Sequence, residues 1–326
     1  MASVADDPRA LDAFLRAHAA VPSGARFAAG TCFGPWRLTA FLGRGGSSEV
    51  YRAVHSSLPL AAAVKVLVRD EAAARARFDR EGWFARTNQD SAFPRFFDRG
   101  EHAGRPYLVT ELLEPAELPR TDRAVADYIL AVAERVGRLH ARGLVHRDLK
   151  PQNVMRRANG ERVIIDFGLL KQVSVRRAPR LPLSRSVVGG RAVGAGTPRF
   201  SAPEQFSGGD VTPAADIHAL GVIVNECFQD RPPRCWAKIV RRATSSIPAQ
   251  RYGDVAAFTR AVRRRHRARR LLVAAVCAGL VALGAAAALW RIDARRAQAA
   301  EARRQAQERI DREHEEIQEM LLRDVY

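Results

Sequence analysis

Lysine and cysteine are both scarce in this chain. Of its 53 cationic side chains all but four are arginines, and the exceptions are Lys65, Lys150, Lys171 and Lys238. A lysine retained against this background is informative, because the planar arginine fork does not reproduce its compact ammonium. The four cysteines have no metal-ligand spacing and do not indicate a disulfide framework in a chain this long. We therefore expect reduced thiols without a chemical role.

The first 33 residues lack a long apolar run, so we expect an N-terminal extension at 1–33 without a signal peptide. The chain has 326 residues, 47% of them hydrophobic, which suffices for a sizeable core and excludes wholesale disorder. Its formal net charge of +18 would suit a polyanionic partner. However, no zinc finger, helix-turn-helix or aromatic stacking motif accompanies the charge, and we predict no nucleic-acid partner.

Charged side chains are absent from residues 271–290, LLVAAVCAGLVALGAAAALW. A helix of this length reaches about 30 Å, the thickness of the hydrocarbon core of a bilayer. The basic run 263–270 precedes it, and positive residues that flank a span stay on the cytoplasmic side and attract anionic lipid. We predict a transmembrane helix at 271–290 in the cell membrane, a juxtamembrane segment at 263–270 that meets membrane lipid, and a short extracytoplasmic helical tail at 291–326.

Two alternatives stay open for this segment. An alanine-rich helix could instead be buried in a soluble protein, although such helices seldom lack a polar face over this length. Small residues at spacing four, such as Ala275 and Gly279, would let two spans approach each other, so a homodimer is also open.

Residues 144–170 concentrate side chains that suit phosphoryl transfer. They include LVHRDLKPQN at 144–153 and VIIDFGLL at 163–170. Transfer needs a carboxylate that accepts the proton of the incoming hydroxyl, for which Asp148 is the candidate. An ammonium such as Lys150 can stabilise charge on the phosphate, and oxygens from Asn153 and Asp166 can hold magnesium.

A glycine-rich turn joins two expected strands within residues 36–54. Gly43, Gly45 and Gly46 would allow the backbone to approach a phosphate without a Cβ clash. Ser48 stands where a third glycine would complete a G-x-G-x-x-G pattern. Taken alone, this stretch is better explained as an ordinary hairpin, because glycine turns between strands are common.

Lys65 interrupts an apolar strand expected at 61–68, and an ammonium there is costly to bury unless it is paired. The helical segment expected at 71–87 supplies Glu81 as the preferred partner. Glu71 is a second candidate, but it lies at the expected helix start, where the helix dipole favours an acid in any case.

These motifs together resemble the protein kinase superfamily. The glycine-rich loop, Ala63-Val64-Lys65, HRDLKPQN, DFG at 166–168, GTPRFSAPE at 196–204 and DIHALGVI at 216–223 occur in family order. A lysine two positions after Asp148 resembles the serine/threonine type, and the single C-terminal span resembles bacterial, eukaryotic-like membrane kinases. The resemblance implies an α+β, two-lobed kinase domain at 34–262, with a β-rich lobe to about 112 and a helical lobe after it.

The same resemblance implies cofactors and roles. It implies ATP and Mg²⁺, with Mn²⁺ as a substitute, and protein substrates with Ser or Thr acceptors. Lys65, paired with Glu81, would contact the α- and β-phosphates; Asp148 would be the base, Lys150 would steady the γ-phosphate, and Thr197 would bridge the last two. Asn153 and Asp166 would bind the metal. The residues implied for ATP binding are Leu42, Gly43, Gly45, Ser48, Val50, Ala63, Lys65, Thr110, Glu111, Leu113 and Met155.

We therefore predict a membrane-anchored serine/threonine protein kinase with a cytoplasmic domain that also phosphorylates itself. Arg147 would meet an activating phosphate, for which Ser174, Ser184 and Ser186 are the nearest hydroxyls, and whether activation needs this phosphate stays open. The alternative is a pseudokinase that acts as a scaffold. Its support is a shortened interval, because only 47 positions separate Glu204 from Arg251. A small-molecule kinase is disfavoured by the GTPRFSAPE segment, which the family uses as a peptide platform.

Overall fold

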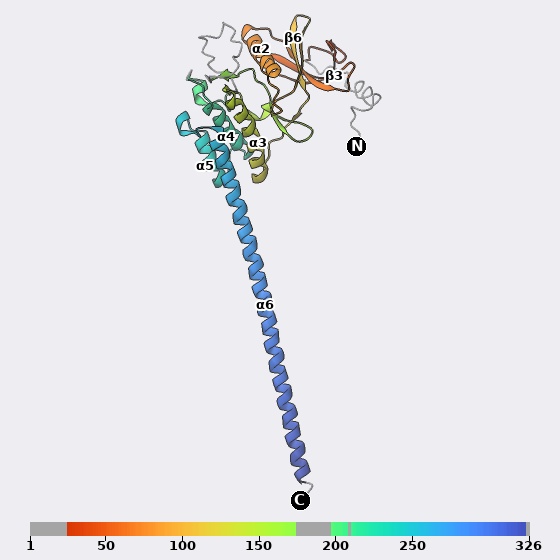
Figure 1. Ribbon diagram of the computed structural model, residues 1–326, viewed down its shortest axis with the longest axis vertical. Helices are drawn as coiled ribbons and strands as arrows, with labels where there is room; N and C mark the ends of the chain where they lie inside the picture. Colours follow the sequence, from red (N-terminus) through yellow and green to blue (C-terminus); the bar gives the residue numbers. More distant parts are fainter. Residues whose placement is uncertain (1–24, 174–196, 208–209, 324–326) are drawn as a thin grey trace. The chain divides into compact units, whose positions relative to one another are not determined.

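The computed structural model describes residues 25–173, 197–207 and 210–323, and within the last range the side chains of 266–274 and 314–323 are not described. The chain divides into two units, residues 1–264 and 265–326. The first unit has a sheet-rich lobe followed by a helical lobe (Figure 1). This is the predicted α+β, two-lobed architecture.

The N-lobe is built on a six-stranded antiparallel sheet in the order β1-β2-β3-β4-β6-β5. Its strands are β1 (Cys32–Phe33), β2 (Trp36–Arg44), β3 (Ser48–His55), β4 (Ala61–Leu67), β5 (Phe96–His102) and β6 (Arg105–Glu111). Alternation along β4 buries Ala62, Val64 and Val66 and turns Lys65 to the opposite face. Phe33 is fully buried, so the folded lobe includes residues before the expected boundary at 34.

Helix α2 (Ala72–Thr87) packs against this sheet through an apolar stripe. Ala74, Phe78 and Ala85 form a buried cluster with Leu67 of β4 and Leu108 of β6. Since residues three and four apart share a helix face, Glu81 lies on the same side as Phe78 and Ala85 and turns toward the sheet. The packing of α2 therefore carries a carboxylate to the face of β4 that presents Lys65.

The C-lobe is a helical layer with small strands at its upper edge (Figure 1). Its helices are α3 (Asp122–Ala141), α4 (Ala214–Cys227), α5 (Arg234–Ala243) and the beginning of α6 (Val255–Arg323). Its strands are β7 (Glu114–Pro115), β8 (Leu144–Val145), β9 (Val154–Arg156), β10 (Arg162–Ile164) and β11 (Lys171–Gln172). The sheets are β10-β9-β7 and β11-β8. One core cluster runs through all four helices, so α3 and α4 form a fixed base for the loops that follow β8 and β10.

The interval after α4 is short, as the sequence indicates. Residues 228–254 contain only α5 and a one-turn 3₁₀ helix, η4 (Pro248–Gln250). Helix α5 buries Trp236, Ile239 and Val240 against the core and leaves Lys238 exposed. The apolar side of the C-lobe is thus closed by α5 and by the first turns of α6, where Phe258 and Val262 are fully buried.

The second unit, residues 265–326, is described as helix through Arg323. Within it, residues 275–313 are long and apolar enough to cross a membrane by length and composition, with a mean hydropathy of 1.8 over an 18-residue window. None of that window is buried in the structure. The predicted span at 271–290 overlaps this helix.

A buried ion pair joins the two ends of the shortened interval. Arg251 is fully buried, and its Nη1 and Nη2 atoms donate to the Glu204 carboxylate at 2.7 and 2.8 Å. The same guanidinium donates to the carbonyl oxygens of Ser245 at 2.8 Å and Ala214 at 2.9 Å. Arg251 therefore ties the GTPRFSAPE segment to the start of α4 and to the loop after α5.

We expect Arg251→Met to lower the free energy of unfolding by about 3–5 kcal/mol, because it leaves the Glu204 carboxylate uncompensated in a buried position. The measurement is chemical denaturation of the purified protein. Arg75→Met is the matched control, since the Arg75–Asp70 pair has side chains 40% and 45% exposed and should change stability by about 0–1 kcal/mol. Equal losses in the two variants would contradict the structural role of Arg251.

Candidate active site

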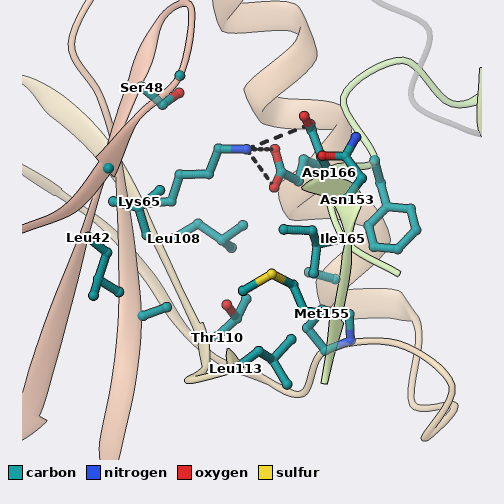
Figure 2. A pocket seen from close by; sticks show the side chains of 18 of the residues that line it. Leu42, Ser48, Lys65, Leu108, Thr110, Leu113, Asn153, Met155, Ile165 and Asp166 are labelled. Atoms are coloured by element: carbon teal, nitrogen blue, oxygen red, sulfur yellow. Dashed lines mark hydrogen bonds and ion pairs between the residues drawn. The ribbon is translucent and has the colours of Figure 1, made fainter. Parts of the chain in front are cut away.

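A cavity of about 710 Å³ lies between the two lobes (Figure 2). Its size is typical of a site for a small ligand or cofactor. The N-lobe contributes Leu42, Gly43, Gly45, Ser48, Val50, Ala63, Lys65, Glu81, Thr110, Glu111 and Leu113. The C-lobe contributes Lys150, Asn153, Met155 and Asp166. Every residue expected to bind ATP or metal therefore lines the same cavity, whereas Asp148 and Thr197 are not part of the lining.

One end of the cavity is apolar. Figure 2 shows Leu42 on one side and Met155 on the other, with Thr110 and Leu113 on the segment that connects the lobes. Val50 of β3 and Ala63 of β4 also line the cavity. Two facing apolar surfaces joined by a stretch of backbone can hold a flat ring and hydrogen-bond its edge.

Sequence reasoning missed several apolar residues of this lining, among them Leu108 and Ile165. Leu108 lies on β6 two residues before Thr110, so strand alternation predicts that both point the same way once Thr110 is placed. Ile165 directly precedes Asp166. Neither carries a chemical signature, and only their position beside predicted site residues could have identified them.

The polar end of the cavity is organised by Lys65. Its Nζ atom lies 2.8 and 2.6 Å from the two carboxylate oxygens of Glu81 and 3.8 Å from Oδ1 of Asp166 (Figure 2). Burial alone would lower the pKa of the Lys65 ammonium, but the carboxylates of Glu81 and Asp166 raise that pKa above its ordinary value. The Lys65 charge is in turn the main cause that holds the pKa of Asp166 below its ordinary value. Lys65 and Asp166 are therefore both charged at neutral pH.

A second polar group surrounds Asp148. Lys150 Nζ donates to Asp148 Oδ2 at 2.8 Å and to Thr197 Oγ1 at 2.9 Å. The Thr197 backbone N–H donates to Asp148 Oδ1 at 3.0 Å. Asn153 Nδ2 donates to the Asp148 carbonyl oxygen at 2.8 Å. Both carboxylate oxygens are thus held by named donors, which fixes the orientation of the Asp148 carboxylate.

Buried Asp216 of α4 holds the loop that presents Asp148. It accepts hydrogen bonds from the backbone N–H groups of His146 and Arg147, both at 2.9 Å, and from His140 Nε2 at 2.8 Å. Burial raises the pKa of the Asp216 carboxyl, but the hydrogen bond and charge of His140 and the backbone donors together hold it below its ordinary value. Arg147 has φ of +71°, a conformation that non-glycine residues rarely adopt. The charged Asp216 carboxylate stabilises this turn.

The glycine-rich turn also has an anchor that the sequence analysis did not identify. Glu49, only 2% exposed, accepts hydrogen bonds from Arg44 at 2.6 and 3.0 Å and from the Tyr51 hydroxyl. The Gly45 N–H donates to the Ser48 carbonyl oxygen at 2.7 Å and closes the turn. The buried Glu49 carboxylate therefore stabilises the glycine-rich turn that lines the cavity, through its hydrogen bonds with Arg44 and Tyr51.

The donor set suits magnesium held jointly with phosphates. Among the described residues, no cluster of three or more His, Cys, Asp or Glu side chains could hold a metal alone. Asn153 and Asp166 instead offer one amide and one carboxylate, and the Ile165 N–H donates to the Asn153 carbonyl oxygen at 2.9 Å, which brings the two residues together. Magnesium is commonly bound by one or two carboxylates plus substrate phosphates and water.

Comparisons with known proteins agree with this geometry. Serine/threonine-protein kinase PknH of Mycobacterium tuberculosis is 33% identical over 215 residues, covering 63% of this chain and 33% of PknH. Serine/threonine-protein kinase Pkn1 of Myxococcus xanthus is 31% identical over 271 residues, covering 70% of this chain and 38% of Pkn1. The chain thus spans about a third of the length of the curated relatives it matches.

The fold comparison points to the same group. The crystal structure of the Mycobacterium tuberculosis PknI kinase domain superposes with a TM-score of 0.54 at 26% identity, covering 73% of this chain and 99% of that domain. The family model for the protein kinase domain matches residues 36–259, more than half of the chain. The chain therefore belongs to the protein kinase family, as its motifs predicted, and the relatives named above are bacterial.

Proposed function

We propose that this protein is a membrane-anchored serine/threonine kinase that transfers the γ-phosphate of ATP to hydroxyl groups of protein substrates. One observation carries the proposal. A single interlobe cavity holds the Lys65–Glu81–Asp166 triad, and the Asp148–Lys150–Thr197 group adjoins it through Lys150 and Asn153. These are the charges that phosphoryl transfer needs, in paired and oriented form.

Nucleotide binding follows from the two ends of the cavity. The adenine ring fits the apolar end between Val50, Ala63 and Met155, where the backbone of Glu111 and Leu113 meets its edge. The phosphates then extend toward Lys65, whose ammonium is held by Glu81 at a fixed place. Magnesium, when bound between the phosphates and the Asn153 and Asp166 oxygens, would neutralise phosphate charge.

The acceptor hydroxyl meets Asp148. Its carboxylate is oriented by Lys150 and Thr197 and can accept the hydroxyl proton as the oxygen attacks phosphorus. The Lys150 ammonium lies 2.8 Å from Asp148 and also lines the cavity, so it can stabilise charge on the transferred phosphate. The serine/threonine preference rests on Lys150 two positions after Asp148 and on the bacterial relatives.

We expect the full-length protein in detergent to transfer label from ATP, with Mg²⁺, to itself and to a basic test protein. Asp148→Asn and Lys65→Met should each lower the rate by at least about a hundredfold, because they remove the base or the phosphate contact. Lys238→Met is the matched control, since Lys238 is exposed on α5, and it should keep the wild-type rate. ATP binding without any transfer by the wild-type protein would instead favour a scaffold.

A phosphate that the kinase adds to itself would be bound by two arginines, Arg147 and Arg80 of α2. Arg147 lies near Arg80, and burial together with the Arg80 guanidinium lowers the pKa of Arg147. The Arg147 Nε atom has no hydrogen-bond partner within the described part of the chain. Two neighbouring guanidinium groups can bind a phosphate by donating charge-assisted hydrogen bonds to its oxygens.

The hydroxyls expected to carry that phosphate, Ser174, Ser184 and Ser186, lie outside the described residues. We expect mass spectrometry after incubation with ATP to find at least one of them modified. Phosphatase treatment should then lower the activity of the wild-type protein but leave Arg147→Ala unchanged, because that variant has lost the phosphate contact. Active enzyme with all three serines unmodified would contradict phosphate-dependent activation at these sites.

Membrane anchoring is supported by the apolar part of α6 and by the basic run before it. In this proposal residues 271–290 cross the cell membrane, residues 1–262 face the cytoplasm and residues 291–326 lie outside. The arginines of 263–270 would contact anionic lipid headgroups. Association of two spans into a homodimer stays a prediction.

We expect the double variant Leu280→Arg, Leu283→Arg to leave the membrane fraction after an alkaline wash, whereas the wild-type protein stays in it. Each central arginine costs about 2.5–3.5 kcal/mol on insertion scales, which is enough to prevent insertion of an alanine-rich span. The matched control, Gln298→Arg with Gln305→Arg, adds the same charge beyond the span and should remain in the membrane. Wild-type protein in the soluble fraction would contradict the anchor.

A further inference from the structure

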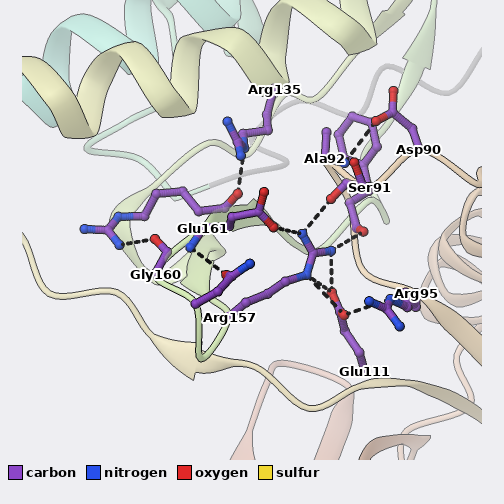
Figure 3. A network of polar contacts seen from close by, with 12 residues as sticks. Asp90, Ser91, Ala92, Arg95, Glu111, Arg135, Arg157, Gly160 and Glu161 are labelled. Atoms are coloured by element: carbon purple, nitrogen blue, oxygen red, sulfur yellow. Dashed lines mark hydrogen bonds and ion pairs between the residues drawn. The ribbon is translucent and has the colours of Figure 1, made fainter.

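Arg157 is the centre of a polar network behind the adenine end of the cavity (Figure 3). It follows β9 in the C-lobe, and its side chain is 12% exposed. Its Nη2 atom lies 2.7 Å from Glu111 Oε1, and its Nε atom lies 3.1 and 3.2 Å from the two oxygens of the same carboxylate. Glu111 ends β6 and is also 12% exposed, so this is a largely desolvated, two-pronged ion pair between the lobes.

The same guanidinium reaches a third segment, the loop between α2 and β5. Arg157 Nη1 donates to the Ser91 carbonyl oxygen at 2.7 Å, and Nη2 donates to the Phe93 carbonyl oxygen at 3.1 Å. Nη1 also lies 3.1 Å from Glu161, which closes the β9–β10 hairpin. Figure 3 shows these contacts converging on one side chain. Arg157 therefore joins the hairpin, the loop 88–95 and the end of β6 at a single point.

These three segments border the place proposed for adenine. Glu111 and Leu113 contribute the backbone of the cavity wall, and Met155, two residues before Arg157, contributes the facing apolar surface. Arg157 and Met155 belong to the same short hairpin. The Arg157–Glu111 contact consequently sets the separation between two parts of the proposed adenine site. One is the segment Glu111–Leu113, which would meet the edge of the ring, and the other is Met155, which would cover its face.

The loop that Arg157 holds also supports the metal end of the cavity. The Phe93 ring packs against Phe84 of α2 and against Phe167, with ring centroids 5.3 and 5.5 Å apart. Phe167 directly follows Asp166. Holding the Phe93 carbonyl therefore also restrains the packing behind Asp166, although through one more contact than at Glu111.

A second arginine at the same carboxylate provides a natural comparison. Arg95 Nε lies 3.7 Å from Glu111 Oε2, and its side chain is 74% exposed. An exposed pair at this distance contributes little, whereas removal of a desolvated partner leaves a buried charge uncompensated. Of the two cations, Arg157 is the one whose loss should disturb the position of Glu111.

We propose that Arg157 is a positioning residue for the nucleotide: it fixes the segment Glu111–Leu113 opposite Met155 by a desolvated ion pair and by two backbone contacts. The inference rests on the proposed function, since it assigns adenine to this end of the cavity. A lysine cannot reproduce the arrangement fully, because its single ammonium cannot serve the carboxylate and both carbonyl oxygens in the same fork geometry.

The test uses full-length protein in detergent with Arg157→Ala, Arg157→Lys and the control Arg95→Ala. We expect Arg157→Ala to raise the KM for ATP about tenfold and to change kcat less than about twofold, because the chemistry at Asp148 is untouched. Arg157→Lys should recover part of the KM, and Arg95→Ala should match the wild-type protein. Hydrogen–deuterium exchange should be faster in residues 106–115 of Arg157→Ala alone.

Several results would overturn the inference. A lower melting temperature of Arg157→Ala, with unchanged KM and unchanged hydrogen–deuterium exchange in residues 106–115, would make Arg157 a purely structural residue. A higher kcat at unchanged KM would make the contact a restraint on turnover rather than a support for binding. If Arg157→Ala does not fold, Glu111→Gln removes the same charge pair and should raise KM in the same direction. A wild-type protein that transfers no phosphate would refute the proposed function. Hydrogen–deuterium exchange in residues 106–115 would still decide whether Arg157 positions the segment Glu111–Leu113.

Discussion

The site depends on one electrostatic constraint, an ammonium group that two lobes must share. Lys65 is on the sheet, Glu81 on α2 and Asp166 at the end of the segment that follows β10. The Lys65 ammonium is stabilised in this position by both carboxylates, and each carboxylate is in turn stabilised by Lys65. The packing of α2 on the sheet and the seating of the Asp166 segment on the C-lobe are therefore coupled through Lys65. The Lys65 ammonium is thereby held at a fixed place in the interlobe cavity, where the phosphates of the proposed nucleotide would meet it.

The C-lobe meets its own constraint through buried carboxylates that serve backbone geometry. Asp216 receives two adjacent backbone N–H groups and thereby stabilises the left-handed Arg147, one residue before Asp148. The Asp148 carboxylate is then oriented by Lys150 and Thr197. Two carboxylates thus have different places: Asp216 is 1% exposed and serves the backbone, whereas Asp148 is 8% exposed and adjoins the cavity through Lys150 and Asn153. Orientation by fixed donors is what the proposed role of Asp148 as a base would require.

Much of this arrangement could be predicted from the sequence, because a charge in the wrong setting is conspicuous. Lys65 inside an apolar strand requires a partner, and a helix with Glu81 on its apolar side supplies one. The chemistry-bearing residues of 144–170 were identifiable for the same reason. Leu108 and Ile165 could not be singled out, since an apolar residue in a strand has the same pattern whether it faces a core or a ligand. Arg157 was hidden by abundance: it is one arginine among many, and two of its partners are carbonyl oxygens more than sixty positions away.

The shortened interval after Glu204 bears on docking more than on the catalytic frame. Contacts that hold the loop before Asp148 come from His140 of α3, from Asp216 of α4 and from Gln205, and Arg251 ties Glu204 to the start of α4. Residues 228–254 retain only α5 and η4, and α5 closes the core with its apolar face. The loss of further helices there removes surface on which a protein substrate could rest, without removing a partner of Asp148, Lys150 or Asp216. A membrane-anchored kinase of the proposed kind would then recruit substrates by another route. Co-location at one membrane is the simplest physical means, since it raises the effective concentration of any substrate held at the same surface.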